Sequence, residues 1–155
     1  MTGQGGTTFT RIVAAIDLVP ESSGSVLRAA RELAAAMRST VLVAHIQESE
    51  HPAVVATAPR AGLRPAPLAA DGELGEAGRA VEHAVSEMRA AGVAAEGRVL
   101  PGAGSTAKEL LTVASSFGAT LIIVGDHGGR VADVLLGSVA HKLVRSAPCP
   151  VLVVR

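Results

Sequence analysis

The length, composition and charge of the chain exclude several classes of protein. At 155 residues it is expected to form one domain with a buried core. Its 14 basic and 14 acidic residues cancel, and it has no Trp, no Tyr and only two Phe, which argues against a nucleic-acid-binding surface. No apolar run approaches the ~20 residues that cross a bilayer, and residues 1–11 show no signal peptide. Since the single Cys149 cannot form an internal disulfide, we expect a cytoplasmic protein. The lack of a long apolar run predicts that the protein contacts no membrane.

The first half of the chain predicts a strand, a helix and a second strand, framed by two irregular segments. Residues 1–10 are expected to form a flexible N-terminal segment. Arg11–Asp17 (RIVAAID) and Thr40–Ile46 (TVLVAHI) are short apolar runs, typical of strands that are buried on both faces of a parallel sheet. Between them, apolar residues recur with helical spacing from Val26 to Met37. Residues 51–71, rich in Pro and Ala, then predict a surface loop, with a lid over a ligand as the alternative.

The second half continues the alternation of helices and strands. The predicted elements are, in order, a helix over Leu74–Met88, a strand over Ala95–Leu100, a helix over Ala107–Phe117, a strand over Thr120–Gly125, a helix from Val139 to Val144 and a strand over Pro150–Val154. This alternation predicts an α/β fold, in which helices cover both faces of an open, parallel, five-stranded sheet. Ligands of such sheets bind outside the carboxyl ends of the strands.

Capping signals predict where the helices begin and end. Ser22 or Ser23 could cap the first helix, and Thr106 with Glu109 has the spacing of a capping box. The predicted helix stops are Gly92, Gly118 and Ala147-Pro148.

The segment Leu121–Val139 (LIIVGDHGGRVADVLLGSV) predicts a strand, a glycine-rich loop and the start of a helix. Its glycines leave the backbone N–H groups open to close approach by a ligand; they are Gly125, Gly128, Gly129 and Gly137. Ser138 and Val139 then open a helix, whose first N–H groups have no internal partner and carry positive dipole character. This combination suits a phosphate and predicts a small nucleotide-binding domain.

Four side chains around this segment could take part in binding, and each has an alternative role. Asp17, at the end of the first strand, could accept hydrogen bonds from both ribose hydroxyls, or it could hold a turn. His127 could donate to a phosphate or remain solvated, and Arg130 could approach the terminal phosphate or point into water. The Ser138 hydroxyl could bond a phosphate oxygen, although helix capping is its expected role.

Two further clusters do not predict a site. Asp126, His127 and Ser138 lack the strained G-x-S-x-G turn of a hydrolytic nucleophile, so we expect no hydrolytic triad. Because no residue stands out as a general base and the chain has no Walker-type Lys, we expect no catalytic residue and no enzyme, with slow ATP hydrolysis as the alternative. The cluster Glu48, Glu50 and His51 lacks the helical spacing of a zinc site, so we expect no metal held by the chain itself.

A second glycine motif follows the third predicted strand. The run Gly102–Ala107 (GAGSTA) fits G-x-G-x-x-[GA], and Asp126 follows about 20 residues later, as in a dinucleotide-binding fingerprint. A small dinucleotide-dependent enzyme that uses Gly102 and Gly104 is therefore one alternative. Because the chain has no room for a separate substrate domain, a tight turn with a helix cap is the expected structure.

Taken together, these residues resemble the universal stress protein family, specifically its small single-domain, ATP-binding members. IVAAID (12–17) is similar to the first strand with its terminal acid, and VAHIQE (43–48) to the second strand. GDHGGRVADVLLGSVAHKLVRSAPCPVLVVR (125–155) is similar to the signature loop, helix and last strand. The resemblance covers nearly all of Arg11–Arg155 and implies one such domain there.

The resemblance implies a Rossmann-like fold, similar to the adenine nucleotide alpha hydrolases, with strand order 3-2-1-4-5. It implies that ATP or another adenine nucleotide, with or without Mg²⁺, binds between the first and fourth strands of a stress-response signalling module. The contacts that it implies are Ile16 and Asp17 near the ribose and base, Ile46 in the adenine pocket, and Val124, Gly125, His127, Gly128, Gly137, Ser138 and Val139 around the rest of the nucleotide. It also implies a homodimer through the last strand, Val151–Val154. Since the third strand would lie at the sheet edge, the crevice at Gly102 is expected to be poor.

One departure from the family pattern leaves an alternative open. The ATP-binding branch has G-x2-G-x9-G-[ST], whereas only eight positions separate Gly128 from Gly137-Ser138 here. The shortening could be absorbed at the tip of the loop, or it could tighten the loop enough to spoil triphosphate binding. In the second case the chain would be a dimeric interaction protein of the same fold that binds no nucleotide.

Overall fold

Five parallel strands form one sheet in the order β3-β2-β1-β4-β5. A computed structural model describes residues 8–48, 75–102, 104–126 and 137–155. The strands are β1 (Arg11–Ala15), β2 (Thr40–Glu48), β3 (Ala94–Gly102), β4 (Leu121–Gly125) and β5 (Val151–Val154). The expected fold class and strand order are therefore confirmed, and the bounds of each strand lie within two residues of the predicted ones.

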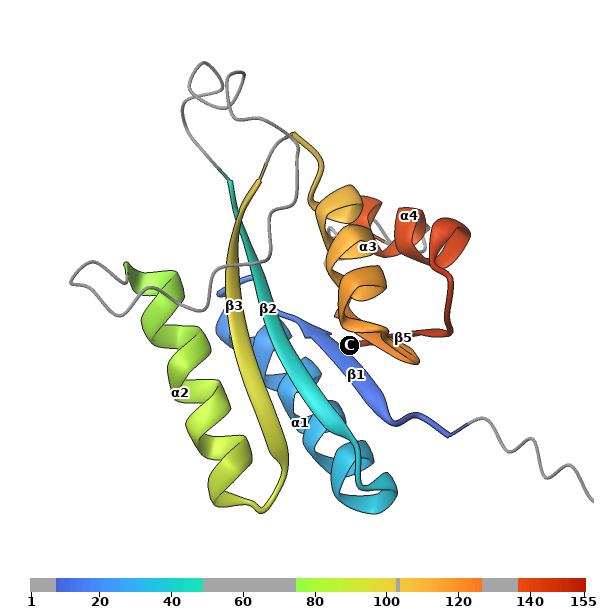
Figure 1. The fold of residues 1–155 in the computed structure, drawn as a ribbon. Coiled ribbons are helices and arrows are strands. Elements are labelled where there is room, and N and C mark those ends of the chain that lie inside the picture. The colour runs from blue at the N-terminus through green and yellow to red at the C-terminus, as the bar shows by residue number, and fades with distance from the viewer. Residues whose placement is uncertain (1–7, 49–74, 103, 127–136) are drawn as a thin grey trace, which may run out of the picture.

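Helices cover both faces of the sheet (Figure 1). They are α1 (Pro20–Met37), α2 (Glu76–Ala90), α3 (Thr106–Phe117) and α4 (Ser138–Ser146). One face carries α1 and α2, and the other carries α3 and α4. Within the described ranges, no helix combines the length and apolarity that crossing a membrane would require.

Alternate residues of each buried strand point into two separate cores. On the central strand β1, Ile12 packs with the α1 and α2 side, whereas Val13 packs with the α3 and α4 side. Its neighbours β2 and β4 follow the same alternation, and Leu42, Ile122 and Ile123 are fully buried. Each such side chain stabilises the fold by about 1.5–3 kcal/mol through removal of apolar surface from water.

Residues just before β1 belong to the folded part of the chain. Thr40 N donates a hydrogen bond to Thr10 O (2.9 Å), and the Ser39 hydroxyl donates to Phe9 O. Phe9 packs partly buried against the α1 and α2 core. The predicted flexible segment therefore includes residues 8–10 that are tied to the sheet, while residues 1–7 and the predicted loop 51–71 lie outside the described residues.

Two of the predicted helix caps are wrong. Helix α1 begins at Pro20 with Val19 as its N-cap, so neither Ser22 nor Ser23 caps it. Pro suits this position because its fixed φ fits a helix and its missing N–H would have had no partner. At α3 the cap is Ser105, one residue before the predicted capping box, and its hydroxyl accepts from Lys108 N (3.4 Å).

The predicted helix ends at glycine are confirmed for α2 and α3. Gly118 (φ 70°) and Gly92 (φ 80°) adopt the left-handed conformation just past these helices. Only glycine enters that region without a steric penalty. The chain therefore turns back toward the sheet at the two positions that the sequence indicated, while predicted helix residue Leu74 lies outside the described residues.

Candidate functional site

A cavity of about 420 Å³ opens at the carboxyl ends of the two central strands β1 and β2. Its lining comes from four elements and the β1–α1 turn: Ala15, Ile16, Asp17, Ala44, His45, Ile46, Thr106, Leu110 and Val139. We call it the nucleoside cavity. The resemblance implied a site between β1 and β4, whereas no residue of β4 lines this cavity, which opens on the β2 side of β1. Strand order reverses between β1 and β4, so the cavity is next to the place where open parallel sheets bind ligands. Four predicted site residues, namely Ile16, Asp17, Ile46 and Val139, come together here.

Asp17 holds the turn between β1 and α1. Its Oδ1 accepts hydrogen bonds from Val19 N (3.0 Å) and from the Ser23 hydroxyl (2.9 Å). Leu18, between Asp17 and Val19, has φ 68°, an uncommon conformation for a bulky residue. The turn alternative that we considered for Asp17 is thus present in the structure. Since Asp17 also lines the nucleoside cavity, contact with a ribose stays a prediction.

His45 is a cavity residue that the sequence reasoning missed. Its Nδ1 lies 2.9 Å from Ile16 O, which can only accept, so Nδ1 carries the proton and Nε2 keeps a lone pair when the ring is neutral. This contact joins the ends of β1 and β2 beside the cavity. The sequence signal that could have identified His45 is its place at the end of a predicted strand, one residue before Ile46.

Val124 and Gly125, two predicted contacts, line neither this cavity nor the second one described below. Val124 packs in the core beneath α3 and α4. A Cβ on Gly125 would collide with the Ser22 hydroxyl of α1, and Val26 lies close by. Close packing of α1 on β4 therefore accounts for the lack of a side chain at this position, and the approach of a ligand to its backbone stays a prediction.

The start of α4 is held by Asp126. Gly137 is the N-cap of this helix, and its N–H donates to Asp126 Oδ1 (3.3 Å). Asp126 Oδ2 forms an ion pair with Arg155 Nε (3.1 Å), and the Asp126 side chain is only 7% exposed. Ser138 is the first helical residue and its side chain makes no capping bond, so its predicted capping role is wrong.

The contacts of Asp126 also bear on the alternative of a dinucleotide-dependent enzyme. Both oxygens of Asp126 are occupied by structural partners, so this carboxylate is poorly placed to bind a dinucleotide ribose. Four predicted site residues, His127, Gly128, Gly129 and Arg130, lie outside the described residues.

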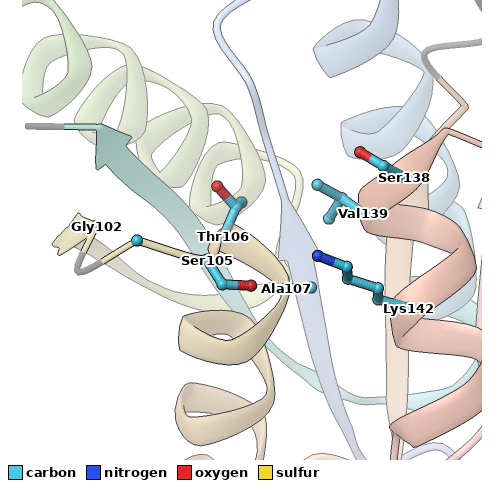
Figure 2. A pocket seen from close by; sticks show the side chains of 8 residues that line it. Gly102, Ser105, Thr106, Ala107, Ser138, Val139 and Lys142 are labelled. Atoms are coloured by element: carbon cyan, nitrogen blue, oxygen red, sulfur yellow. The ribbon is translucent and has the colours of Figure 1, made fainter.

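A second cavity, of about 400 Å³, lies between the first turns of α3 and α4 (Figure 2). We call it the α3–α4 pocket, and its lining residues are Gly102, Gly104, Ser105, Thr106, Ala107, Ser138, Val139 and Lys142. The edge position of β3 is confirmed, but the expectation of a poor crevice at Gly102 is wrong. The reason is that α4 packs beside α3 and supplies the second wall.

Cys149 is half-buried, and burial raises the pKa of its thiol, which agrees with the expected unreactive role. No cluster of three or more potential metal ligands occurs in the part of the chain that the structure describes. Strand β5 forms one edge of the sheet, with Leu152 36% exposed.

Comparisons with known proteins agree with this architecture. The family model described as "Universal stress protein family" matches residues 8–155. Universal stress protein YxiE of Bacillus subtilis (strain 168) is 31% identical over 153 residues, which cover 95% of this chain and 99% of YxiE.

Two solved structures that share the fold are complexes with a nucleotide. One is a universal stress protein in complex with cAMP (TM-score 0.66, 23% identity, covering 96% of this chain and 98% of that chain). The other is the universal stress protein from Archaeoglobus fulgidus in complex with dAMP (TM-score 0.61, 20% identity, covering 96% and 99%). The near-complete match of the family model, together with the similarity to YxiE, shows that this chain belongs to the universal stress protein family.

Proposed function

We propose that this chain binds an adenine nucleotide in the nucleoside cavity and acts as a binding module in a stress response. The observation that carries the proposal is the convergence of Ile16, Asp17, Ile46 and Val139 on one cavity at the carboxyl ends of β1 and β2. Its volume of about 420 Å³ falls in the range of small-molecule sites, roughly 300–1,000 Å³.

The chemistry of the lining suits a nucleoside. Ala15, Ala44, Ile46 and Leu110 offer apolar surface for the faces of a base, and Asp17 offers a carboxylate for a hydroxyl group. Val139, in the first turn of α4, brings the amides of a helix start to the edge of the cavity, where a phosphate is favoured.

The ligands of the two related structures indicate which parts of a nucleotide this cavity is expected to recognise. The compounds cAMP and dAMP share an adenine base and one phosphate, but neither offers two free ribose hydroxyls. Recognition of the base and of one phosphate is therefore the better-supported part of our proposal. A double hydrogen bond from a ribose to Asp17, and a preference for ATP, are finer proposals that rest on the resemblance of the motifs.

Isothermal titration calorimetry tests the proposal. We expect AMP, cAMP and ATP to bind with one site per chain, and GMP to bind at least about tenfold more weakly, because the same cavity must then accept a different hydrogen-bonding edge. The absence of heat and of any thermal shift at ligand concentrations near 1 mM would contradict the proposal. Binding of NADH without AMP would favour the dinucleotide-dependent alternative instead.

We also propose a homodimer formed through β5. This strand is a sheet edge within the described residues, and its Leu152 is 36% exposed, so pairing with a second copy would satisfy backbone groups and cover apolar surface. Sedimentation velocity at about 50 µM should then give a dimer, and a single monomer boundary would argue against it. A dimer without any nucleotide binding is the outcome expected for an interaction protein.

A further inference from the structure

The α3–α4 pocket has the chemistry of an anion site. Among the residues that the structure describes, Lys142 is the one charged residue that lines it, and no carboxylate does so. Hydroxyl groups come from Ser105 and Thr106 of the α3 start and from Ser138 of α4. Hydroxyls can donate to an anion, and a lysine ammonium supplies three donors and a full charge. The chain as a whole has a formal net charge of zero, so this positive character is local.

The ammonium group of Lys142 is available for a ligand. Figure 2 shows the side chain leaving α4 and extending toward the start of α3, into the space between the two helices. The side chain of Lys142 forms no ion pair or hydrogen bond with any described residue, in contrast to that of Arg155, which is paired with Asp126. Ser138 and Lys142 are four residues apart on one helix and therefore lie on the same face.

The two cavities are neighbours and share part of their walls. Thr106 and Val139 line both the nucleoside cavity and the α3–α4 pocket. A ligand held by its base and ribose near Asp17 would thus reach Val139 first and the ammonium of Lys142 beyond it. This order matches that of base, sugar, first phosphate and further phosphates in a nucleoside polyphosphate.

We propose that the α3–α4 pocket holds the second and third phosphates of a nucleoside polyphosphate, with Lys142 as their counter-ion. The inference rests on the proposed function, since it requires the nucleoside in the adjoining cavity. A monophosphate would not reach the ammonium group of Lys142, so its binding would not depend on this charge. The pocket would therefore set the preference for phosphate number, and the nucleoside cavity would set the preference for the base.

Calorimetry on one substitution, with a matched control, tests the proposal. In Lys142→Gln we expect ATP affinity to fall about tenfold and AMP affinity to stay within about twofold, because only the longer ligand reaches the ammonium. Lys142→Arg should keep most of the ATP affinity, since the charge remains. Lys108→Gln is the control: Lys108 is exposed on α3, lies outside the pocket lining and is the only other lysine of the chain.

The presence of only two lysines allows a second, independent readout. Acetylation of the native protein by an amine-directed reagent, followed by mass spectrometry, should show that ATP protects Lys142 but leaves Lys108 reactive. AMP should protect neither. Equal acetylation of Lys142 with and without saturating ATP would overturn the proposal, as would equal loss of AMP and ATP affinity in Lys142→Gln. If the unmodified protein binds neither nucleotide, the proposed function fails together with this inference; if it binds AMP and ATP equally well, only the inference fails.

Discussion

Replacement of Val139 by Phe is expected to weaken AMP binding by at least about tenfold, or ~1.4 kcal/mol. Val139 is half-buried in the first turn of α4 and lines both cavities, so a phenyl ring at this position would fill the space that the nucleotide must occupy. Val and Phe have similar helix propensities, so α4 itself should be little affected. Calorimetric titration with AMP measures the effect, and urea unfolding reports whether stability has changed.

The same helix offers a matched control for this experiment. Val144→Phe makes the same chemical change at a position that is 50% exposed and lines neither cavity. We expect Val144→Phe to bind AMP like the unmodified chain. Binding by Val139→Phe that equals binding by Val144→Phe would mean that the nucleotide, if bound, lies elsewhere on the protein.

Leu143→Ala is expected to lower the free energy of unfolding by about 2–5 kcal/mol. Leu143 is fully buried and packs in the core beneath α3 and α4, where its loss would leave a cavity. This side chain is the principal anchor of a helix of nine residues that also carries Ser138, Val139 and Lys142. A short helix depends on such packing because its own propensity is insufficient.

Urea denaturation compares this variant with Val144→Ala, which truncates the neighbouring exposed side chain. The control should change stability by less than about 0.5 kcal/mol. A cost below about 1 kcal/mol for Leu143→Ala would indicate that α4 does not pack on the sheet as described. Calorimetry of Leu143→Ala with AMP separately measures whether loss of this packing weakens nucleotide binding.

The sheet could be predicted from the sequence because its strands are buried on both faces. Continuous apolar runs such as Ile12–Ala15 and Leu121–Val124 are the direct consequence of that burial, and the helical periods between them set the α/β alternation. The strand order came from the resemblance, since local patterns do not specify which strands are neighbours. Helix starts were less predictable, because Pro20 and the Asp17–Ser23 hydrogen bond took the place of the expected serine cap.

The candidate site could be predicted only in part. Asp17 was predicted because it ends a strand, where a parallel sheet binds ligands, whereas Ile16 and Ile46 were implied by the resemblance; all three line the nucleoside cavity. The packing constraint on Gly125 could not be predicted, since its contact with Ser22 joins residues that are far apart in the sequence. His45 and Lys142 were missed because their importance depends on tertiary neighbours: the carbonyl of Ile16 for one, and the packing of α4 on α3 for the other.

The hydrogen bond from Gly137 N to Asp126 Oδ1 has a consequence for how this protein can vary. It joins the end of β4 to the start of α4 through a single carboxylate oxygen. The other oxygen of Asp126 pairs with Arg155, the residue that follows β5. One side chain therefore connects three parts of the fold, and a substitution of Asp126 would disturb all three at once.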